Sequence, residues 1–206
     1  NFSTGINTVE VTGATNIDGG ILEIAAGTFD ANGDFKADGA TVTFTGDGTL
    51  KLGGNSVGTP DLGTLNDDAG LPNISKGTVI YDNQGGPQTI YDAANLGTGY
   101  FNLIIDNDAQ VATCGVALPV HGNLTIGSLS NPGNLTLNTI GTGVTHLTLG
   151  GNFELIDGIF IPGDGDHTVA GTWAESGGTT FEATAGKFTF TGHTKTITTD
   201  AAGGNK

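Results

Sequence analysis

The residues of this chain that could do chemistry include paired aspartates. Asp164 and Asp166 stand two positions apart, and such residues share one face of a strand. Two carboxylates at short range serve as the catalytic pair of many glycoside hydrolases. The pair lies in a turn-like sequence, however, and an enzyme acting on acidic sugars also needs a cation to bind the substrate carboxylate. The chain has no arginine and only six scattered lysines, so we expect no catalytic residues and no enzymatic activity.

Calcium binding is the second chemistry that the carboxylates suggest. The segment Asp30–Asp34 places oxygen donors at alternate positions, as the first part of a calcium-binding loop does. The match then ends, because Phe35 stands where such a loop has glycine and Thr41 where it has a bidentate glutamate. Aspartate and asparagine are also ordinary turn residues. We therefore expect no required cofactor, and the candidate ligands for a calcium ion are Asp30, Asp34, Asp164 and Asp166.

Aromatic and histidine side chains give two weaker signals. Exposed aromatic rings can stack on sugars or on a second copy of the chain, although packing at the edge of a turn is the alternative. The candidates for such contacts are Trp173, Tyr81, Tyr91 and Tyr100. The four histidines recur without a fixed period, so we expect isolated, partly exposed positions and no metal ladder. They are His121, His146, His167 and His193.

Charge excludes two classes of partner. The 206 residues include 21 acidic and 6 basic side chains, which gives a formal net charge of −15. A nucleic-acid-binding protein needs basic residues to displace counterions from phosphates, and anionic lipid surfaces repel an acidic protein. No apolar run approaches the roughly 20 residues that span a bilayer. We therefore expect neither nucleic-acid binding nor membrane insertion.

Short strands are the elements that must position these side chains. Three similar phrases occur in the second half of the chain, each a Gly-Asn turn signal followed by apolar and polar residues in alternation. They are Gly122–Ile126, Gly133–Leu137 and Gly151–Leu155. Alternation places Leu124 and Ile126 on one face of a strand and Thr125 on the other. Together with the 37 glycines and the many threonines, this pattern predicts an all-β fold with almost no helix.

Two all-β architectures suit strand-like segments that recur about every 11 to 12 residues. An antiparallel sandwich needs tight hairpins, and Asp38-Gly39 and Asp47-Gly48 are candidates for them. A solenoid needs repetition on a larger scale, which the similar segments Gly39–Gly46, Gly77–Asn83 and Gly186–Gly192 provide. We favour a right-handed parallel β-helix with turns of roughly 22 to 35 residues, and the antiparallel β-sandwich remains the alternative.

The repeats resemble the long β-helical repeats of secreted bacterial surface proteins and adhesins. The resemblance covers about residues 77–199 and rests on the order of these segments: Gly77–Tyr81, Gln88–Ile90, Tyr100–Ile105, His121–Ile126, Leu147–Phe153, Lys187–Phe190 and Lys195–Ile197. It implies a scaffold or adhesive role outside the cell and brings no catalytic residues. The segment 55–76 departs from the pattern and is expected to be an inserted loop, and 201–206 a flexible tail.

These observations lead to one functional prediction with two alternatives. We expect residues 1–206 to form a single elongated β-domain, a structural subunit or segment of a filament or adhesive assembly at the cell surface. Its partner would be further copies of itself or a larger surface assembly. The alternatives are a carbohydrate-binding adhesin module, with polysaccharide as partner, and a polysaccharide-degrading enzyme. Because the chain begins with Asn1 rather than methionine, we also expect a processed segment of a longer exported polypeptide.

Overall fold

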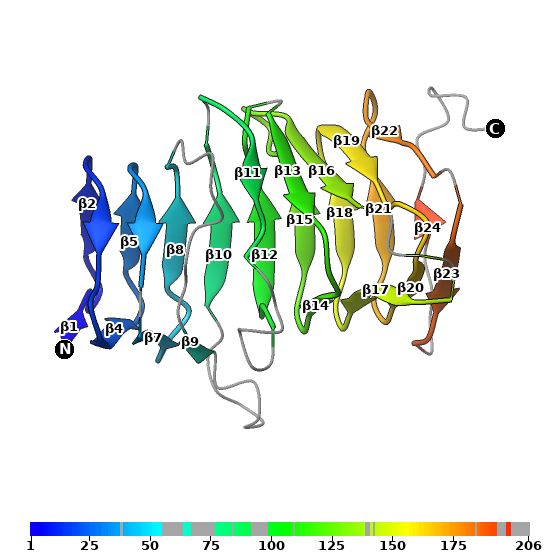
Figure 1. The fold of residues 1–206 in the computed structure, drawn as a ribbon. Helices are drawn as coiled ribbons and strands as arrows, with labels where there is room; N and C mark the ends of the chain where they lie inside the picture. Colours follow the sequence, from blue (N-terminus) through cyan, green and yellow to red (C-terminus); the bar gives the residue numbers. More distant parts are fainter. Residues whose placement is uncertain are drawn as a thin grey trace.

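The computed structural model describes residues 1–37, 39–54, 64–66, 77–83, 85–91, 99–108, 110–138, 141, 143–183, 185–192 and 197–198. Every regular element in these ranges is a β-strand, and all of the strand pairs are parallel (Figure 1). The described part of the chain therefore contains no helix that could cross a membrane. The parallel β-solenoid predicted from the repeats is confirmed, and the antiparallel sandwich is excluded.

One continuous sheet of nine strands runs the length of the solenoid (Figure 1). Each of its strands comes from a different turn of the chain. In spatial order they are β2 (Thr8–Val11), β5 (Thr28–Ala31), β8 (Thr49–Leu52), β10 (Thr78–Tyr81), β12 (Asn102–Ile105), β15 (Leu124–Ile126), β18 (Phe153–Leu155), β21 (Trp173–Glu175) and β24 (Ile197–Thr198). We refer to it as the long sheet.

Four shorter sheets form the other sides of the solenoid. In the described part of the chain, a strand of the first pair of sheets precedes each strand of the long sheet except β12. These strands are β1 (Phe2–Ser3), β4 (Gly20–Ile24), β7 (Ala40–Phe44) and β9 (Thr64–Asn66), and then β14 (Leu118–Val120), β17 (Thr145–Leu149), β20 (Asp166–Val169) and β23 (Lys187–Phe190). Among the described residues, a strand of the second pair of sheets follows each strand of the long sheet except β8 and β24. The strands of this second pair are β3 (Thr15–Asn16) and β6 (Phe35–Lys36), and then β11 (Gln88–Thr89), β13 (Val111–Cys114), β16 (Gly133–Leu137), β19 (Gly158–Ile161) and β22 (Thr180–Phe181).

Strand register gives the length of a turn. Asn123 bonds to Asn102, 21 residues earlier, and Asn152 bonds to Asn123, 29 residues earlier. The next bond of the same kind joins Thr172 to Asn152, 20 residues apart. The turn of 29 residues lies within the predicted range of 22 to 35, and the turns of 20 and 21 residues lie just below it, because some corners between sheets need only a few residues.

Columns of apolar side chains fill the interior. In the long sheet, Leu103 stands in register with Leu124, Leu124 with Phe153, and Phe153 with Trp173. None of the four side chains is more than 4% exposed. Burial of one such side chain contributes about 1.5 to 3 kcal/mol, so each turn is stabilised by its contact with the next.

The predicted inserted loop at 55–76 contains one described strand, β9, which pairs with β7. The other residues of this range, and the tail predicted at 201–206, lie outside the described residues.

Candidate functional site

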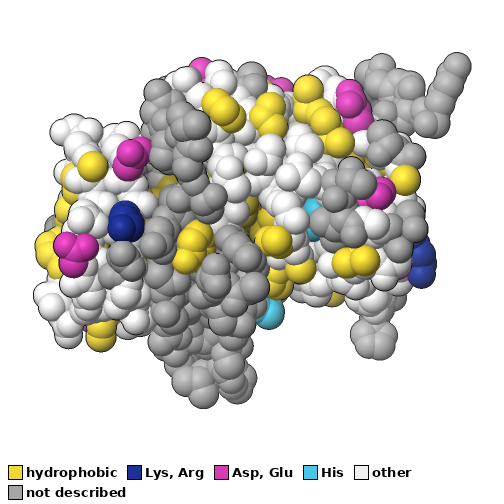
Figure 2. Space-filling view, viewed as in Figure 1, with side chains coloured by type: hydrophobic (Ala, Val, Ile, Leu, Met, Phe, Trp, Pro, Cys, Tyr) yellow, Lys and Arg dark blue, Asp and Glu magenta, His cyan; other side chains and the backbone are white. Residues whose placement is uncertain are grey.

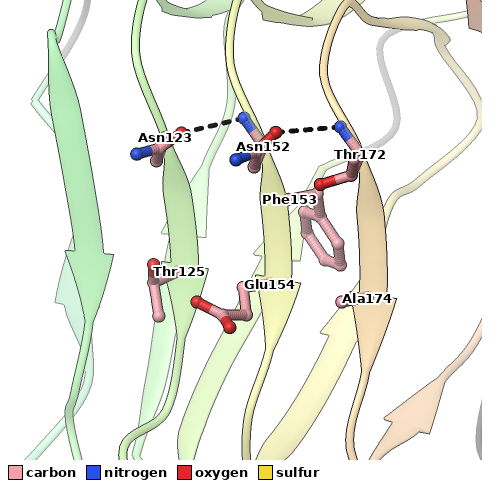
Figure 3. A pocket seen from close by; sticks show the side chains of 7 residues that line it. All are labelled: Asn123, Thr125, Asn152, Phe153, Glu154, Thr172 and Ala174. Carbon is pink, nitrogen blue, oxygen red and sulfur yellow. Dashed lines mark hydrogen bonds between the residues drawn. The ribbon is translucent and has the colours of Figure 1, made fainter. Parts of the chain in front are cut away.

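A ladder of asparagine side chains crosses the long sheet from turn to turn, at the end where its strands begin (Figure 3). The Oδ1 atom of Asn102 accepts a hydrogen bond from the backbone N–H of Asn123 (3.0 Å), and Asn123 Oδ1 accepts one from the N–H of Asn152 (2.9 Å). Asn152 Oδ1 accepts the last, from the N–H of Thr172 (2.9 Å). Each asparagine therefore ties its own turn to the following one, at the corner where the chain enters the long sheet.

The ladder explains two of the three Gly-Asn phrases. Gly122–Ile126 and Gly151–Leu155 occupy consecutive turns, with Leu124 in register with Phe153. The third phrase, Gly133–Leu137, is β16 on a different side of the solenoid. There the backbone N–H of Asn134 donates to Oδ1 of the buried Asn107 (3.0 Å). The same local pattern therefore serves two sides of the fold.

A shallow hollow opens beside this ladder on the outer surface of the long sheet. We call it the Asn152 hollow, and it is lined by Asn123, Thr125, Asn152, Phe153, Glu154, Thr172 and Ala174. Its surface is mostly polar. Glu154 stands in register with Thr125 on one side and Ala174 on the other, so the glutamate has a shorter neighbour on each side. The hollow arises from this alternation of long and short side chains.

Comparison of the chain with protein-family models, curated proteins and solved structures found no match.

One of the candidate calcium ligands, Asp30, lies near a lysine. Asp30 Oδ2 is 3.4 Å from the ammonium nitrogen of Lys51, and Asp82 Oδ2 is 2.7 Å from it. Burial raises the pKa of Asp82 above its ordinary value, although Lys51 acts in the opposite direction. Burial lowers the pKa of Lys51, but its hydrogen bonds and charge interactions with the two carboxylates raise it by more. A lysine ammonium thus stands where a calcium ion would compete for Asp30.

The other candidate ligands hold the chain in place. Asp164 Oδ1 accepts a hydrogen bond from the N–H of Gly141 (3.0 Å). Asp166 begins β20, and the backbone carbonyl of Asp34 accepts a bond from Thr15 (2.7 Å). Across the described ranges, no group of three or more His, Cys, Asp or Glu side chains is placed to hold a metal ion.

The four candidate aromatic contacts belong largely to the interior. Trp173 is 4% exposed, stacks on Phe153 with ring centroids 3.9 Å apart, and donates from Nε1 to Glu175 (2.7 Å). Tyr81 and Tyr100 are fully buried, and their hydroxyls lie 2.9 Å apart. The half-buried Tyr91 bonds to both through its backbone. Trp173, Tyr81 and Tyr100 therefore pack the core, and their rings face away from a ligand in solution.

Two histidines occupy unexpected positions. His146 and His167 are fully buried in neighbouring turns, with nearly parallel rings whose centroids lie 6.2 Å apart. His167 also stacks on Phe188 at 4.5 Å. The expectation of partly exposed positions is wrong for this pair, whereas His121 is exposed and His193 lies outside the described residues. A register shift between Thr145 and Leu147 in β17 occurs at His146, which is why the strand alternation does not predict its burial.

The two ends of the solenoid expose apolar side chains. At the first turn an apolar groove is lined by Phe2, Val9, Val11, Thr15, Ile17, Ile21, Leu22 and Phe29. Phe2 is 49% exposed, and Ile6 in the same turn is 83% exposed. Apolar side chains reach the surface at this end of the molecule (Figure 2). At the opposite end, three phenylalanines pack only partly buried against the core. They are Phe181, Phe188 and Phe190.

Proposed function

We propose that this chain is an extracellular structural protein, a β-solenoid subunit or segment of a surface filament or adhesive assembly. The observation that carries the proposal is the stack of parallel strands from turn to turn, because the strand at each end of such a stack can pair with a strand of a further turn. Among the described strands, the long sheet ends at β2 on one side and at β24 on the other. The resemblance of the repeats to those of secreted bacterial surface proteins supports a location outside the cell.

An open end of a solenoid favours addition of another turn. An edge strand presents unpaired N–H and C=O groups, and β2 does so beside the apolar groove of the first turn. The last turn of a second copy offers parallel strands and the half-buried Phe188 and Phe190. A contact between unlike ends does not close on itself, so repeated addition gives a fibre.

The net charge of the chain opposes this contact. The net charge of −15 repels one copy from another, and salt screens that repulsion over distances beyond about 10 Å at 0.1 M ionic strength. We therefore expect assembly to strengthen when salt or divalent cations are added.

Electron microscopy and sedimentation velocity of the purified chain test this proposal. We expect filaments whose length grows with salt concentration. In the variant Val9→Lys, a charge points into the apolar groove from the edge strand, and assembly should be lost. Thr148→Lys adds the same charge on an exposed position in the middle of the stack and should assemble normally.

Two results would count against the proposal. One is a monomer at every salt concentration, and the other is a Val9→Lys variant that assembles like the unmodified chain. Antibody labelling of intact and permeabilised source cells tests the location separately. Labelling only after permeabilisation would contradict an extracellular role.

A further inference from the structure

We infer that the Asn152 hollow is a binding site for a neutral saccharide. This inference goes beyond the structural role and does not depend on assembly, because the hollow lies on the outer surface of the long sheet rather than at its ends. Four features of the hollow support it: fixed donors, nearby acceptors, a polar lining and an acidic charge.

The donors are two side-chain amides whose orientation is set by the ladder. Only the oxygen of an asparagine amide accepts a hydrogen bond from a backbone N–H, so the bonds to Asn152 and Thr172 fix which way each amide faces. The Nδ2 groups of Asn123 and Asn152 consequently point the same way, toward the preceding turn (Figure 3). Both side chains are exposed. Donors that are already oriented lose little conformational entropy when a ligand binds.

The acceptors lie on the same surface. The carboxylate of Glu154 extends toward Thr125 (Figure 3), and Glu154 is exposed to solvent. The hydroxyls of Thr125 and Thr172 can each donate and accept. The hollow therefore offers donors and acceptors side by side on one surface, which complements a ligand whose own groups both donate and accept. Sugar hydroxyls are groups of that kind.

Other ligand classes fit the hollow less well. Its mostly polar lining does not suit an apolar ligand. An added peptide strand would need free backbone groups, but β15, β18 and β21 are already paired with one another. Glu154 and the net charge of −15 repel anions, including acidic sugars and nucleic acids.

The ladder also sets the size of the ligand. Neighbouring strands of a sheet lie about 4.8 Å apart, so the amides of Asn123 and Asn152 repeat at about that distance. This distance is close to the advance per residue of an extended pyranose chain. One sugar residue would therefore face each turn, and a tetrasaccharide should bind more tightly than the corresponding monosaccharide.

Nuclear magnetic resonance of the full, isotope-labelled chain tests the inference. The probes are cellotetraose, maltotetraose and mannotetraose, with tetragalacturonate as the anionic comparison. We expect at least one neutral tetrasaccharide to shift the side-chain amide signals of Asn123 and Asn152, and to bind more tightly than tetragalacturonate.

A pair of matched variants separates binding from folding. Asn152→Asp keeps an oxygen that can accept from Thr172 but removes the Nδ2 donor, so binding should weaken about fivefold, as expected for one hydrogen bond. Asn16→Asp makes the same chemical change at an exposed strand position in the first turn, away from the hollow, and should bind like the unmodified chain. Glu154→Gln removes only the charge, so the ratio of the affinity for a neutral saccharide to that for an anionic one should decrease.

Three outcomes would overturn the inference. They are the absence of any shift at the two amides with all three neutral probes, an unchanged affinity in Asn152→Asp, and tighter binding of tetragalacturonate than of every neutral probe. Because Glu154 is exposed, the Glu154→Gln variant remains informative even if Asn152→Asp fails to fold.

Discussion

Replacing His167 by leucine should remove a large part of the acid sensitivity of this fold. His167 is fully buried, and neither of its ring nitrogens has a hydrogen-bond partner. Its column in the preceding turns is occupied by Leu118 and then Leu147, so a leucine suits the position. The variant His167→Leu therefore keeps the packing and removes the titrating group.

The size of the effect follows from the pKa of the buried imidazole. Burial and the neighbouring His146 lower the pKa of His167 from 6.5 to about 4, with Asp166 acting weakly in the opposite direction. Between these two pH values the unfolded chain binds a proton that the folded chain does not, so stability falls as pH drops from 6.5 to 4. At 1.36 kcal/mol per pKa unit, the loss is about 3 kcal/mol.

His146 acts in the same direction. Burial lowers its pKa, although the backbone carbonyls of Cys114 and Val116 favour the protonated form. These carbonyls do not meet hydrogen-bond geometry with either ring nitrogen. The unmodified chain should therefore lose somewhat more stability in acid than His167 alone explains. In the His167→Leu variant, the loss of stability that remains in acid should come only from His146 and the carboxylates.

Urea unfolding at a series of pH values provides the assay. The free energy of unfolding of His167→Leu minus that of the unmodified chain should increase by about 3 kcal/mol as pH falls from 7.5 to 4. Carboxylates titrate in both proteins, so their contributions to the free energy of unfolding largely cancel in the difference between the two proteins. Parallel pH profiles for the two proteins would refute the reasoning, as would a His167 ring signal that titrates near pH 6.5 in the folded chain.

Two further substitutions test the packing of the turns. Gly158 has a φ of +106°, and an added Cβ would overlap the backbone oxygen of Gly133, so Gly158→Ala should cost more than about 2 kcal/mol in urea unfolding. Gly5→Ala, at positive φ but with open space, should cost only about 1 kcal/mol, and equal losses would contradict the packing argument. Lys51→Met should cost about 1 to 2 kcal/mol at pH 7, because it leaves Asp30 and Asp82 together without a cation. Since the pKa of Asp82 is already raised, this loss should shrink as pH falls and the carboxyl is protonated; a constant loss would refute it.

Strand alternation was sufficient to predict the strands and their buried faces, because it is a local property. The side chains of Leu124 and Ile126 are buried and that of Thr125 is not, as the period of two requires. Repetition at the length of a turn then favoured a solenoid, with the antiparallel sandwich left as the alternative. The local sequence pattern could not show, however, to which side of the solenoid a strand belongs. The segment Gly133–Leu137 has the same pattern as the other two Gly-Asn phrases but lies in another sheet.

The candidate site depended on contacts between turns, which sequence spacing does not determine. Asp30 was a candidate calcium ligand, but the register places Lys51 beside it in the next turn. The Gly-Asn phrases were identified as turn signals, whereas the bonds from their side chains to the following turn require the stacked structure. One signal could have revealed them: in three consecutive turns an asparagine comes directly before the first buried apolar residue of the strand, at Asn102, Asn123 and Asn152.

The ladder has a consequence for how such a chain can change. Its Asn123–Asn152 step spans 29 residues and the next step spans 20, yet the same hydrogen bond closes both. Extra residues in a corner therefore leave the stacking of the long sheet undisturbed. Doubling the length of a loop costs only about 0.6 kcal/mol of closure entropy. The corners are consequently suitable sites for inserting foreign peptides, each of which would be displayed at a defined position along the solenoid axis.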